Sequence, residues 1–591
     1  MVWVRATQLH IGDQRSNTSG EADANMDVQQ KRRGVASWIY AERRIYGKST
    51  EIMCGYWYEK PFMLKMALMM FLGLTVLLLP QYLTFNSSLR QRLIGSSLLV
   101  VRGKTTEAVR SKPDETLGGL LLPPVVFENS TCISRSQEYS LRVKTSRYKP
   151  SLDLIAKLRE YERRHRRCAP KAKYFNLSKN ATEREFRECR FIVWIATAGL
   201  GNRVMTLASA FVYALLTDRV LLIDRSGNPN ELFCEPFPST SWLLPETFPN
   251  EWMREIKANS SFRLGFLIQN DALTSSHNGY AYLNMMHDYD GYDRKFFCAD
   301  CQAYLSRFPW LFLKSNQYFI PGLHFIPEFH EHVDKLFPER ETVFHHIVRY
   351  LFHPSDSVWR LISSFYNTNL ANAQHQVGLQ IRYLAKPNIT TTTISDLVLN
   401  CTLENKLLPN VTLSEDHVDD SPKNTTSISV LVASLHEVFY ESLQEFYQNR
   451  SSSDGRHLGV YTASHEEGQY LESIDHDKKA LVDIYLLSLS DTLVTSSWST
   501  FGYVAQGISG VMPWLLTHLE SGEELEEVLR NRNYCHHGVS LEPCFHMPPA
   551  LDCDNKGWYD NPGKTLPYIQ YCEDVWWGIK IMEPAPFNRS L

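Results

Sequence analysis

A strand, a glycine turn, a helix and a second strand follow one another between residues 191 and 224, and this order constrains the fold most. Phe191-Ile-Val-Trp-Ile-Ala-Thr is a short apolar run rich in β-branched and aromatic residues, which predicts a buried strand. The turn Ala198-Gly-Leu-Gly-Asn202 leads into a helical stretch over 203–217, and a second apolar run covers 219–224. This βαβ unit is the building block of a parallel sheet, so the sequence predicts an α/β fold.

The C-terminal half repeats this alternation of strands and helices. Three short apolar runs predict strands at 377–382, 458–462 and 491–495, and helical stretches cover 476–489 and 498–508. At 591 residues the chain is too long for one ordinary core. We therefore expect two Rossmann-type α/β halves that face a cleft, preceded by a helix over 151–167. The Thr-, Asn- and Ser-rich interval 386–428 predicts a long glycosylated surface loop.

An uncharged apolar segment, Met66–Phe85, stands apart from the rest of the chain. Its 20 residues match the length that crosses a bilayer, so it predicts a single transmembrane anchor. A buried core helix and a cleaved signal peptide are the alternatives, and the signal peptide is disfavoured because the segment begins only at residue 66. Residues 1–65 would be a cytosolic tail, unless Met53 or Met63 is the true start, and residues 86–150 would be a stem.

The chain after this segment has the composition of a secretory-pathway protein. Eleven of the twelve cysteines lie there, which favours an oxidising compartment. We therefore expect a cytosolic N-terminus and a large lumenal body. The net charge of −4 gives no sign of a phosphate-backbone binder, so we expect no nucleic-acid partner. Ten N-x-S/T glycosylation sequons lie in the same region: Asn129, Asn176, Asn180, Asn259, Asn388, Asn400, Asn410, Asn424, Asn449 and Asn588.

The segment 496–506 and Arg382 are the strongest candidates for chemistry. Ser496-Ser-Trp-Ser-Thr-Phe501 follows a predicted strand and opens a helix. Hydroxyl side chains there would cap the helix, and its free N–H groups and dipole make its start a natural seat for a diphosphate. Arg382 ends an apolar strand, where ligands bind in open α/β sheets, and its guanidinium suits a diphosphate leaving group. A capped helix with nothing bound and a structural ion pair are the alternatives.

Two further motifs give weaker signals. The turn Gly199-Leu-Gly-Asn202 lacks the full G-x-G-x-x-G pattern. Its glycines either make the turn, with Asn202 as the cap, or let a bare backbone approach a ligand across the cleft. His287-Asp-Tyr-Asp290 contains a D-x-D, which in some glycosyltransferases holds a divalent metal, but its surroundings are typical of a loop.

The cysteine pattern predicts disulfides and no zinc site. Cys298-Ala-Asp-Cys301 has no second C-x-x-C, so one disulfide cysteine and one unpaired thiol are expected. Asn316 and His345-His346 lie in an aromatic-rich region, and we interpret them as packing residues. Disulfides are expected to staple a loop-rich tail that carries Cys535, Cys544, Cys553 and Cys572.

Taken together, these segments resemble the plant xyloglucan α-1,2-fucosyltransferase family, the galactoside 2-alpha-L-fucosyltransferases of glycosyltransferase family 37. The resemblance covers about residues 114 to 580, in family order. It is carried by Gly199-Leu-Gly-Asn-Arg203, Tyr213-Ala-Leu-Leu-Thr-Asp-Arg-Val-Leu-Leu222, Leu232-Phe-Cys-Glu-Pro-Phe-Pro238, Ser241-Trp-Leu-Leu-Pro245, Gly378-Leu-Gln-Ile-Arg382, Trp498-Ser-Thr-Phe-Gly-Tyr-Val-Ala-Gln-Gly507 and Glu542-Pro-Cys-Phe-His546.

The resemblance implies a GT-B-like fold, an inverting mechanism, no metal requirement and a Golgi type II membrane protein. The donor would be GDP-fucose, and the acceptor the 2-hydroxyl of a terminal galactose on xyloglucan or arabinogalactan; a homodimer is left open. It implies an acceptor-side domain at 151–370, a GDP-fucose-binding domain at 371–530 and the disulfide-stapled segment at 531–591. Arg382 would act in catalysis and donor binding. The other donor-binding residues would be Ser496, Ser497, Trp498, Ser499, Thr500, Phe501, Gly199, Gly201, Asn202 and Arg203.

The general base is less constrained than the donor site. His287, Asp288 and Asp300 are the candidates for taking the proton from the acceptor hydroxyl. Asn316 stands where some family members carry Asp, and an amide cannot act as a base. Either no base is essential, in keeping with an oxocarbenium-like transition state, or the acceptor is handled differently. A protein O-fucosyltransferase and an inactive Golgi scaffold are the alternative functions.

Overall fold

The computed structural model describes residues 114–127, 132–142, 146–175, 188–249, 253, 260–270, 279–412, 428–448, 451–452, 456–471, 473–549, 553 and 562–583. The predicted anchor at 66–85 lies outside these residues, as do the sequon asparagines other than Asn388, Asn400 and Asn410. Within the described ranges, no helix is both long and apolar enough to span a membrane. The described residues all belong to one compact unit that begins at Ser111.

The first sheet is a four-stranded parallel sheet in the order β2 (Val220–Ile223), β1 (Phe191–Ile195), β4 (Trp310–Ser315) and β3 (Tyr280–Met285). Every residue of β1 and β2 is buried, as expected for parallel strands that are covered on both faces. Between them runs α7 (Leu200–Leu216), an apolar helix with almost all of its residues buried. The βαβ unit predicted from the sequence is therefore confirmed.

The second sheet has six strands in the order β12 (Cys535–His537), β11 (Trp514–Leu516), β10 (Thr492–Ser496), β5 (His375–Gln380), β7 (Ile428–Ala433) and β9 (Leu458–Tyr461). All neighbours are parallel except β11 and β12. After β5 the chain forms β7 and β9, which lie on one side of β5. After β10 it forms β11 and β12, which lie on the opposite side of the sheet. The boundary between β5 and β10 is therefore a topological switch point, where ligands bind in open α/β sheets.

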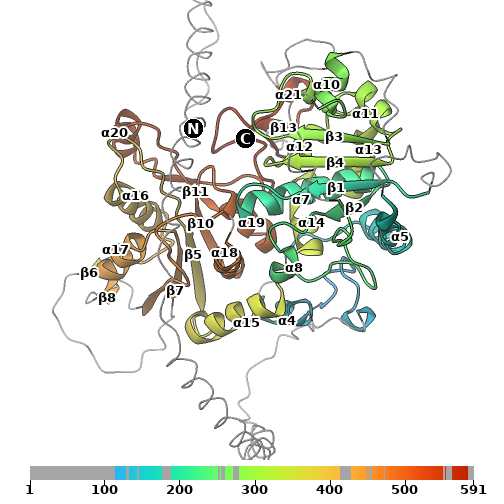
Figure 1. The fold of residues 1–591 in the computed structure, drawn as a ribbon. Coiled ribbons are helices and arrows are strands. Elements are labelled where there is room, and N and C mark those ends of the chain that lie inside the picture. Colours follow the sequence, from blue (N-terminus) through green and yellow to red (C-terminus); the bar gives the residue numbers. More distant parts are fainter. Residues whose placement is uncertain are drawn as a thin grey trace, which may run out of the picture. The chain divides into compact units, whose positions relative to one another are not determined.

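Helices α7, α14 (Val343–Leu351), α18 (Ile474–Ser488) and α19 (Thr500–Ser509) pack against one another and join the two halves (Figure 1). The contact between α14 and α19 is close, because a Cβ atom at Gly507 would overlap the ring of Phe344. One hydrophobic core runs through all four helices and the first sheet, and a second lies on the far face of the second sheet.

The structure describes further helices and strands around the two sheets. The α-helices are α4 (Ile133–Leu141), α5 (Leu152–Cys168), α8 (Pro229–Leu232), α10 (Leu264–Gln269), α11 (Ala299–Leu305), α12 (Ile320–Leu323), α13 (Pro327–Leu336), α15 (Asp356–Phe365), α16 (Thr391–Glu404), α17 (Val438–Tyr447), α20 (Gly522–Asn531) and α21 (Pro562–Thr565). The short strands are β6 (Val411–Thr412), β8 (Ser451–Ser452), β13 (Ile569–Tyr571) and β14 (Ile579–Ile581). The 3₁₀ helices are Pro124–Val126, Ala169–Tyr174, Asp293–Phe297 and Arg340–Thr342, and Tyr366–Leu370 is a π-helix.

Helix α16 corrects the prediction of one long loop over 386–428. Thr390 caps this helix by accepting a hydrogen bond from the N–H of Thr393, and the two residues form a capping box. Leu397, Val398 and Cys401 are buried on its inner face. Asn388 and Asn410 are exposed at the two sides of the helix, whereas Asn400 lies on the helix and is only partly exposed.

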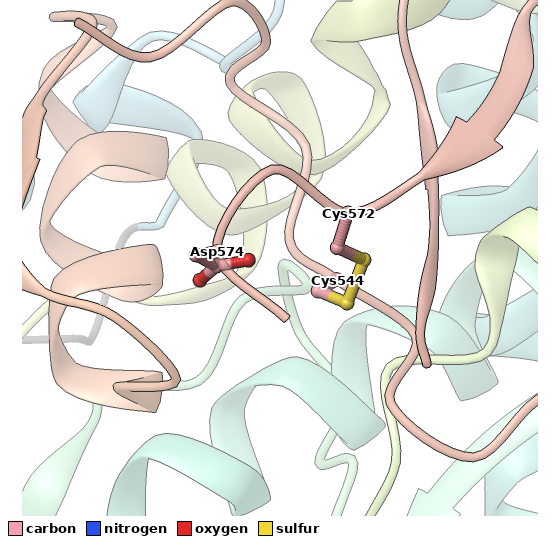
Figure 2. A group of neighbouring side chains, drawn as sticks. All are labelled: Cys544, Cys572 and Asp574. Atoms are coloured by element: carbon pink, nitrogen blue, oxygen red, sulfur yellow. A yellow bond between two sulfur atoms is a disulfide. The ribbon is translucent and has the colours of Figure 1, made fainter. Parts of the chain in front are cut away.

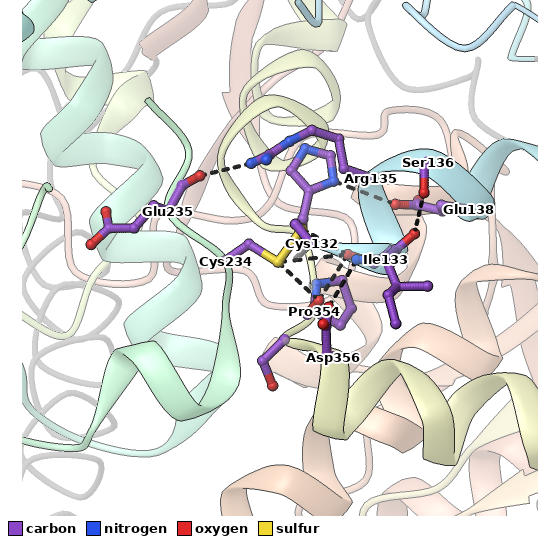
Figure 3. Close-up of a disulfide and its surroundings, with 12 residues drawn as sticks. Cys132, Ile133, Arg135, Ser136, Glu138, Cys234, Glu235, Pro354 and Asp356 are labelled. Atoms are coloured by element: carbon purple, nitrogen blue, oxygen red, sulfur yellow. Dashed lines mark hydrogen bonds and ion pairs between the residues drawn. A yellow bond between two sulfur atoms is a disulfide. The ribbon is translucent and has the colours of Figure 1, made fainter. Parts of the chain in front are cut away.

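The predicted stem over 86–150 is too long, because its last part belongs to the folded body. Cys132, at the start of α4, forms a disulfide with Cys234 (Figure 3). Beside it, the N–H of Ile133 donates to Asp356 Oδ1 at 2.8 Å, and Arg135 donates to the carbonyl of Glu235 at 2.7 Å (Figure 3). Described residues from Asp114 onward are thus part of the body.

Disulfides join distant segments, and only one staples the C-terminal segment to itself. Cys544 pairs with Cys572, whereas Cys535 pairs with Cys401 of α16 and Cys553 with Cys298. All four cysteines of the segment 531–591 are thus in disulfides, and two of them tie it to other parts of the body. Cys301 is an unpaired, buried thiol, as expected. The fifth bridge joins Cys168 and Cys189.

Asp483 is a buried carboxylic acid in the middle of α18. Ser464 donates a hydrogen bond to its Oδ2 at 2.7 Å, but its Oδ1 has no partner among the described residues. Burial raises the pKa of Asp483 from 3.8 to about 7, because the charged form loses its hydration.

Replacing Asp483 with asparagine is expected to stabilise the protein, and by more at pH 8 than at pH 5. Because its folded-state pKa is raised, the stability that Asp483 contributes is full below pH 3.8 and is lost as the pH rises to about 7. The amide avoids this loss, so the gain should be about 2 to 3 kcal/mol larger at pH 8. Urea denaturation at both pH values measures it, with the exposed Glu526→Gln as control. An equal effect at both pH values would contradict the assignment.

Candidate active site

Arg382 lies at the β5–β10 switch point, two residues after the end of β5. Its backbone N–H donates to the hydroxyl of Ser496, the last residue of β10, at 2.9 Å. Its Nη1 donates to the carbonyl of Trp498 at 3.1 Å, and the side chain is exposed. The structure therefore brings together Arg382 and the 496–501 segment, which are more than a hundred residues apart in the sequence.

The start of α19 differs from the expected capped helix. Ser499 is the residue before the helix, but no side chain of the described residues caps the first turn by a hydrogen bond. The hydroxyls of Ser496 and Ser497 donate instead to the carbonyls of Gln380 and Leu516, so they tie strand ends together. The prediction that hydroxyls cap this helix is therefore wrong. The first turn of α19 keeps its positive dipole end beside Arg382.

Asp574 and its neighbours also lie on the side of the site where Arg382 is found. They were not identified from the sequence. Asp574 lies between β13 and β14, close to the disulfide Cys544–Cys572 (Figure 2). Its Oδ2 accepts a hydrogen bond from the N–H of Trp498 at 3.2 Å and another from the hydroxyl of Tyr503. The carboxylate is buried, and its Oδ1 has no partner within the described part of the chain.

The turn at Trp498 therefore links a carboxylate to Arg382. Trp498 has a positive φ of 54°, which is uncommon for a residue other than glycine. Its N–H is held by Asp574, and its carbonyl accepts from Arg382. Asp574 thus fixes a strained peptide that orients the guanidinium.

His546 lies beside this group. Its Nε2 is 3.3 Å from the hydroxyl of Tyr503, and its ring packs against Trp498. The pKa of His546 is lowered to about 4, chiefly because the ring is buried; the charge of Asp574 opposes this shift and that of Arg382 adds to it. The imidazole is therefore neutral at neutral pH. Its signal in the sequence is the motif 542–546, which gave no role to the histidine.

A second polar group lies at the carboxyl ends of β3 and β4. The N–H of His287 donates to Asn316 Oδ1 at 2.9 Å, and this fixes the amide so that its Nδ2 faces His287 Nδ1 at 2.7 Å. Gln317 also donates to Asn316 Oδ1, at 3.0 Å, and supports this orientation. Because Nδ1 accepts a hydrogen bond, the neutral imidazole carries its proton on Nε2. The ring nitrogen of His287 that Asn316 leaves free is therefore a donor, which disfavours the prediction that His287 acts as a base.

The C-terminal segment connects the two groups. Gln317 Oε1 accepts a hydrogen bond from the N–H of Met547 at 3.2 Å, and the carbonyl of Met547 accepts from the hydroxyl of Tyr289 at 2.7 Å. Met547 directly follows His546, which contacts Tyr503. A short stretch of backbone thus joins the carboxyl ends of both sheets.

The glycine turn at the start of α7 approaches the start of α19. A Cβ atom at Gly201 would overlap the side chain of Thr500, and one at Gly199 would lie 2.8 Å from Gln469 Nε2. Gly201 is therefore needed for close packing across the two halves, whereas the Gln469 side chain could move away from a larger residue at position 199. Gly199, and not Asn202, is the residue before the helix, so the expectation that Asn202 caps it is wrong.

Arg203 differs from the expectation of a donor-binding residue. Its Nη2 makes a buried ion pair with Asp477 of α18, and both side chains are almost fully buried. The buried carboxylate of Asp477 already neutralises the charge of Arg203, and this ion pair links α7 to α18. We interpret Arg203 as a structural residue.

The candidate aspartates Asp288, Asp290 and Asp300 do not lie together as the ligands of a metal ion would. Asp290 pairs with Arg263 at 3.1 Å, while Asp288 is exposed, and Asp300 is exposed in the first turn of α11. Among the described residues, Cys544, Cys572 and Asp574 are close enough to share an ion (Figure 2). The two sulfurs are bonded to each other, so they cannot ligate a metal as thiolates.

His345 and His346 have the packing role expected of them. Both lie in α14 and are buried. His345 Nδ1 is 2.7 Å from the carbonyl of Gly507, and its Nε2 is 2.9 Å from the hydroxyl of Ser146. Burial, together with the charge of Arg349, holds the pKa of His345 well below its usual value.

Comparisons of the sequence and of the structure with known proteins point to the same kind of protein. The family model described as xyloglucan fucosyltransferase matches residues 97–554. A galactoside 2-alpha-L-fucosyltransferase of Arabidopsis thaliana is 42% identical over 478 residues, which are 79% of this chain and 83% of the relative. One of Pisum sativum is 40% identical over 483 residues, or 81% and 84% of the two chains. A solved mutant of Arabidopsis thaliana FUT1 in complex with GDP is 39% identical, with a TM-score of 0.69, and covers 79% of this chain and all of that one.

Proposed function

The chain belongs to the xyloglucan fucosyltransferase family, and we propose that it moves L-fucose from GDP-fucose to the 2-hydroxyl of a terminal galactose on xyloglucan or a related galactoside such as arabinogalactan. It is thus a glycosyltransferase. The proposal rests mainly on one observation: Arg382 lies beside the start of α19 at the β5–β10 switch point. The solved relative with GDP supports a nucleotide in such a fold.

The donor half of the reaction uses positive charge at the switch point. We place the diphosphate of GDP-fucose between the Arg382 guanidinium and the first turn of α19. As the bond between fucose C1 and the phosphate oxygen breaks, negative charge develops on the departing GDP. The guanidinium and the helix N–H groups stabilise this charge, and stabilisation of developing charge in the transition state is what accelerates the reaction.

The acceptor half follows from an inverting displacement. The galactose 2-hydroxyl attacks fucose C1 on the face opposite to GDP, so one C–O bond forms as the other breaks. The acceptor would lie toward the carboxyl ends of β3 and β4, where His287 offers its Nε2–H to a sugar oxygen. With His287 as donor, we assign no strong base; an oxocarbenium-like transition state lets the hydroxyl lose its proton late, to solvent water.

The proposal includes the orientation of the protein in the membrane. We infer a single-pass type II protein of the Golgi membrane, with the anchor at 66–85 and the described body in the lumen. A GT-B-like arrangement, with two Rossmann-type domains facing a cleft, fits the two sheets. Five disulfides in the described residues support an oxidising compartment. The exposed sequon residues Asn388 and Asn410 are consistent with glycosylation there.

Fucosyl transfer is expected to persist in EDTA. Arg382 and the α19 start supply the positive charge that a divalent ion provides in other glycosyltransferases, and Asp290 of the D-x-D is already paired with Arg263. Initial rates with and without EDTA measure this. A loss of activity that Mn²⁺ or Mg²⁺ restores would contradict the proposal and revive the D-x-D as a metal site.

An acceptor screen tests the proposed function. Purified protein is incubated with GDP-fucose and either galactosylated xyloglucan, arabinogalactan or a protein with exposed Ser and Thr. Transfer to one of the two polysaccharides is expected. Transfer to the protein alone would favour a protein O-fucosyltransferase, and no turnover at all would favour an inactive scaffold.

A further inference from the structure

The turn between β13 and β14 exposes one large aromatic side chain next to the candidate active site. Trp576 is 48% exposed, and it is the most exposed of the tryptophans that the structure describes. Tryptophan is usually highly buried, since its ring carries a large apolar surface. Tryptophan is also enriched at binding interfaces, so an exposed tryptophan beside the candidate active site is a candidate binding residue.

The residues around Trp576 are firmly held. Asp574 and Val575 are buried, and the N–H of Cys572 donates to the carbonyl of Gly578 at 3.0 Å across the turn. A Cβ atom at Gly578 would overlap Cys544 Sγ, so the turn packs directly on the Cys544–Cys572 disulfide. The backbone of Trp576 is thus set in place before any ligand binds, which lowers the entropy lost on binding.

A chain of aromatic rings connects Trp576 to Arg382. The rings of Trp576 and Trp577 are edge to face at 5.6 Å between centroids, and Trp577 and Trp498 are related in the same way at 5.6 Å. The carbonyl of Trp498 accepts the hydrogen bond from Arg382. Trp576 therefore contacts Trp577, which contacts Trp498, the residue that accepts the hydrogen bond from Arg382. Trp576 lies outside the candidate active site but next to it.

We propose that Trp576 is a stacking platform for a pyranose ring of the acceptor glycan, one or more residues away from the galactose that receives fucose. This assignment rests on the proposed function. One face of a pyranose presents C–H groups and is apolar, and the π-face of an indole is electron-rich, so the two surfaces stack. The contact binds the polymer and leaves the reacting centre untouched. It therefore favours acceptors longer than one sugar.

The test compares acceptors of different length in the full chain. For Trp576→Ala, the KM for galactosylated xyloglucan is expected to rise about three- to tenfold, from the energy of an aromatic contact. The KM for GDP-fucose, the hydrolysis of GDP-fucose without acceptor and the transfer to a small galactoside should stay unchanged. Trp576→Phe should restore most of the affinity. Tyr571→Ala is the matched control, since Tyr571 is 40% exposed on the same hairpin.

Binding without turnover separates this proposal from the proposed function. Isothermal titration of galactosylated xyloglucan into the donor-free chain should give a Kd weakened by the same factor in Trp576→Ala. If the wild-type chain binds xyloglucan but transfers no fucose, the proposed function fails while the platform stands. An unchanged Kd and KM in Trp576→Ala, or an equal rise in KM for the small galactoside, would overturn the platform.

Discussion

Replacing Arg382 with alanine is expected to lower kcat/KM for fucosyl transfer by about a hundred- to a thousandfold, the cost of losing one donor aimed at charge that develops in the transition state. Arg382 lies two residues beyond the end of β5 and its side chain is exposed, so alanine opens no cavity in the core. The fold should therefore persist, and the loss should lie mainly in kcat. Steady-state kinetics with GDP-fucose and galactosylated xyloglucan measure it.

Two variants sharpen the result for Arg382. Arg382→Lys keeps the charge but loses the planar fork that binds a diphosphate through two bonds, so it should recover only part of the rate. Arg530→Ala removes an exposed arginine of α20 and is expected to leave the rate unchanged. Near-normal turnover in Arg382→Ala, with a thermal melt like that of the wild type, would refute the donor site placed here.

Replacing Asp574 with asparagine is expected to lower kcat by about ten- to a hundredfold, although Asp574 is a positioning residue and contacts no substrate in this account. Its carboxylate holds the N–H of Trp498, and the carbonyl of the same residue holds Arg382. A misplacement of about 1 Å can cost a factor of a hundred in rate. Asparagine keeps the size and one acceptor oxygen, so the protein should still fold.

Three comparisons separate positioning by Asp574 from mere support of the fold. Asp574→Ala leaves the Trp498 N–H and the Tyr503 hydroxyl without their partner and should also lower the free energy of unfolding, by about 1 to 3 kcal/mol. Tyr503→Phe removes only the hydroxyl contact and should reduce the rate less. In Asp574→Asn the KM for GDP-fucose should rise with the loss in kcat. Unchanged kinetics in Asp574→Asn would contradict the positioning role.

Local patterns in the sequence predicted the framework because each pattern reflects one element. The apolar run at 191–195 and the buried face of α7 carry their periodicity within a few residues, and so do β10 and α19. Arg382 and the 496–501 segment could be paired for the same reason. Arg382 ends one predicted strand and the 496–501 segment follows another, and the carboxyl ends of parallel strands meet at one edge.

The parts that were missed depend on contacts between distant segments. Asp574 meets Tyr503 across 71 residues, and Cys298 meets Cys553 across 255, so neither pair leaves a local pattern. Helix α16 was mistaken for a loop because its Thr and Asn residues are typical of loops. Its signal was the cap at Thr390, followed by buried Leu397 and Cys401 at helical spacing.

Hydrogen-bond geometry changed the roles of two predicted residues. Arg203 was expected at the donor, but Asp477 of α18 neutralises it inside the core. His287 was a candidate base, and the amide of Asn316 makes it a donor. Residue type alone leaves such roles open, since the same arginine or imidazole serves either purpose according to its partner.

The linkage of the product shows whether the chain transfers fucose as proposed. The chain is incubated with GDP-fucose and galactosylated xyloglucan, and the isolated oligosaccharide product is characterised by NMR and by methylation analysis. We expect an α-linked L-fucose on O2 of the terminal galactose, with inversion from the β-linked donor. Fucose on another hydroxyl, retained anomeric configuration, or fucose found only on protein side chains would contradict it.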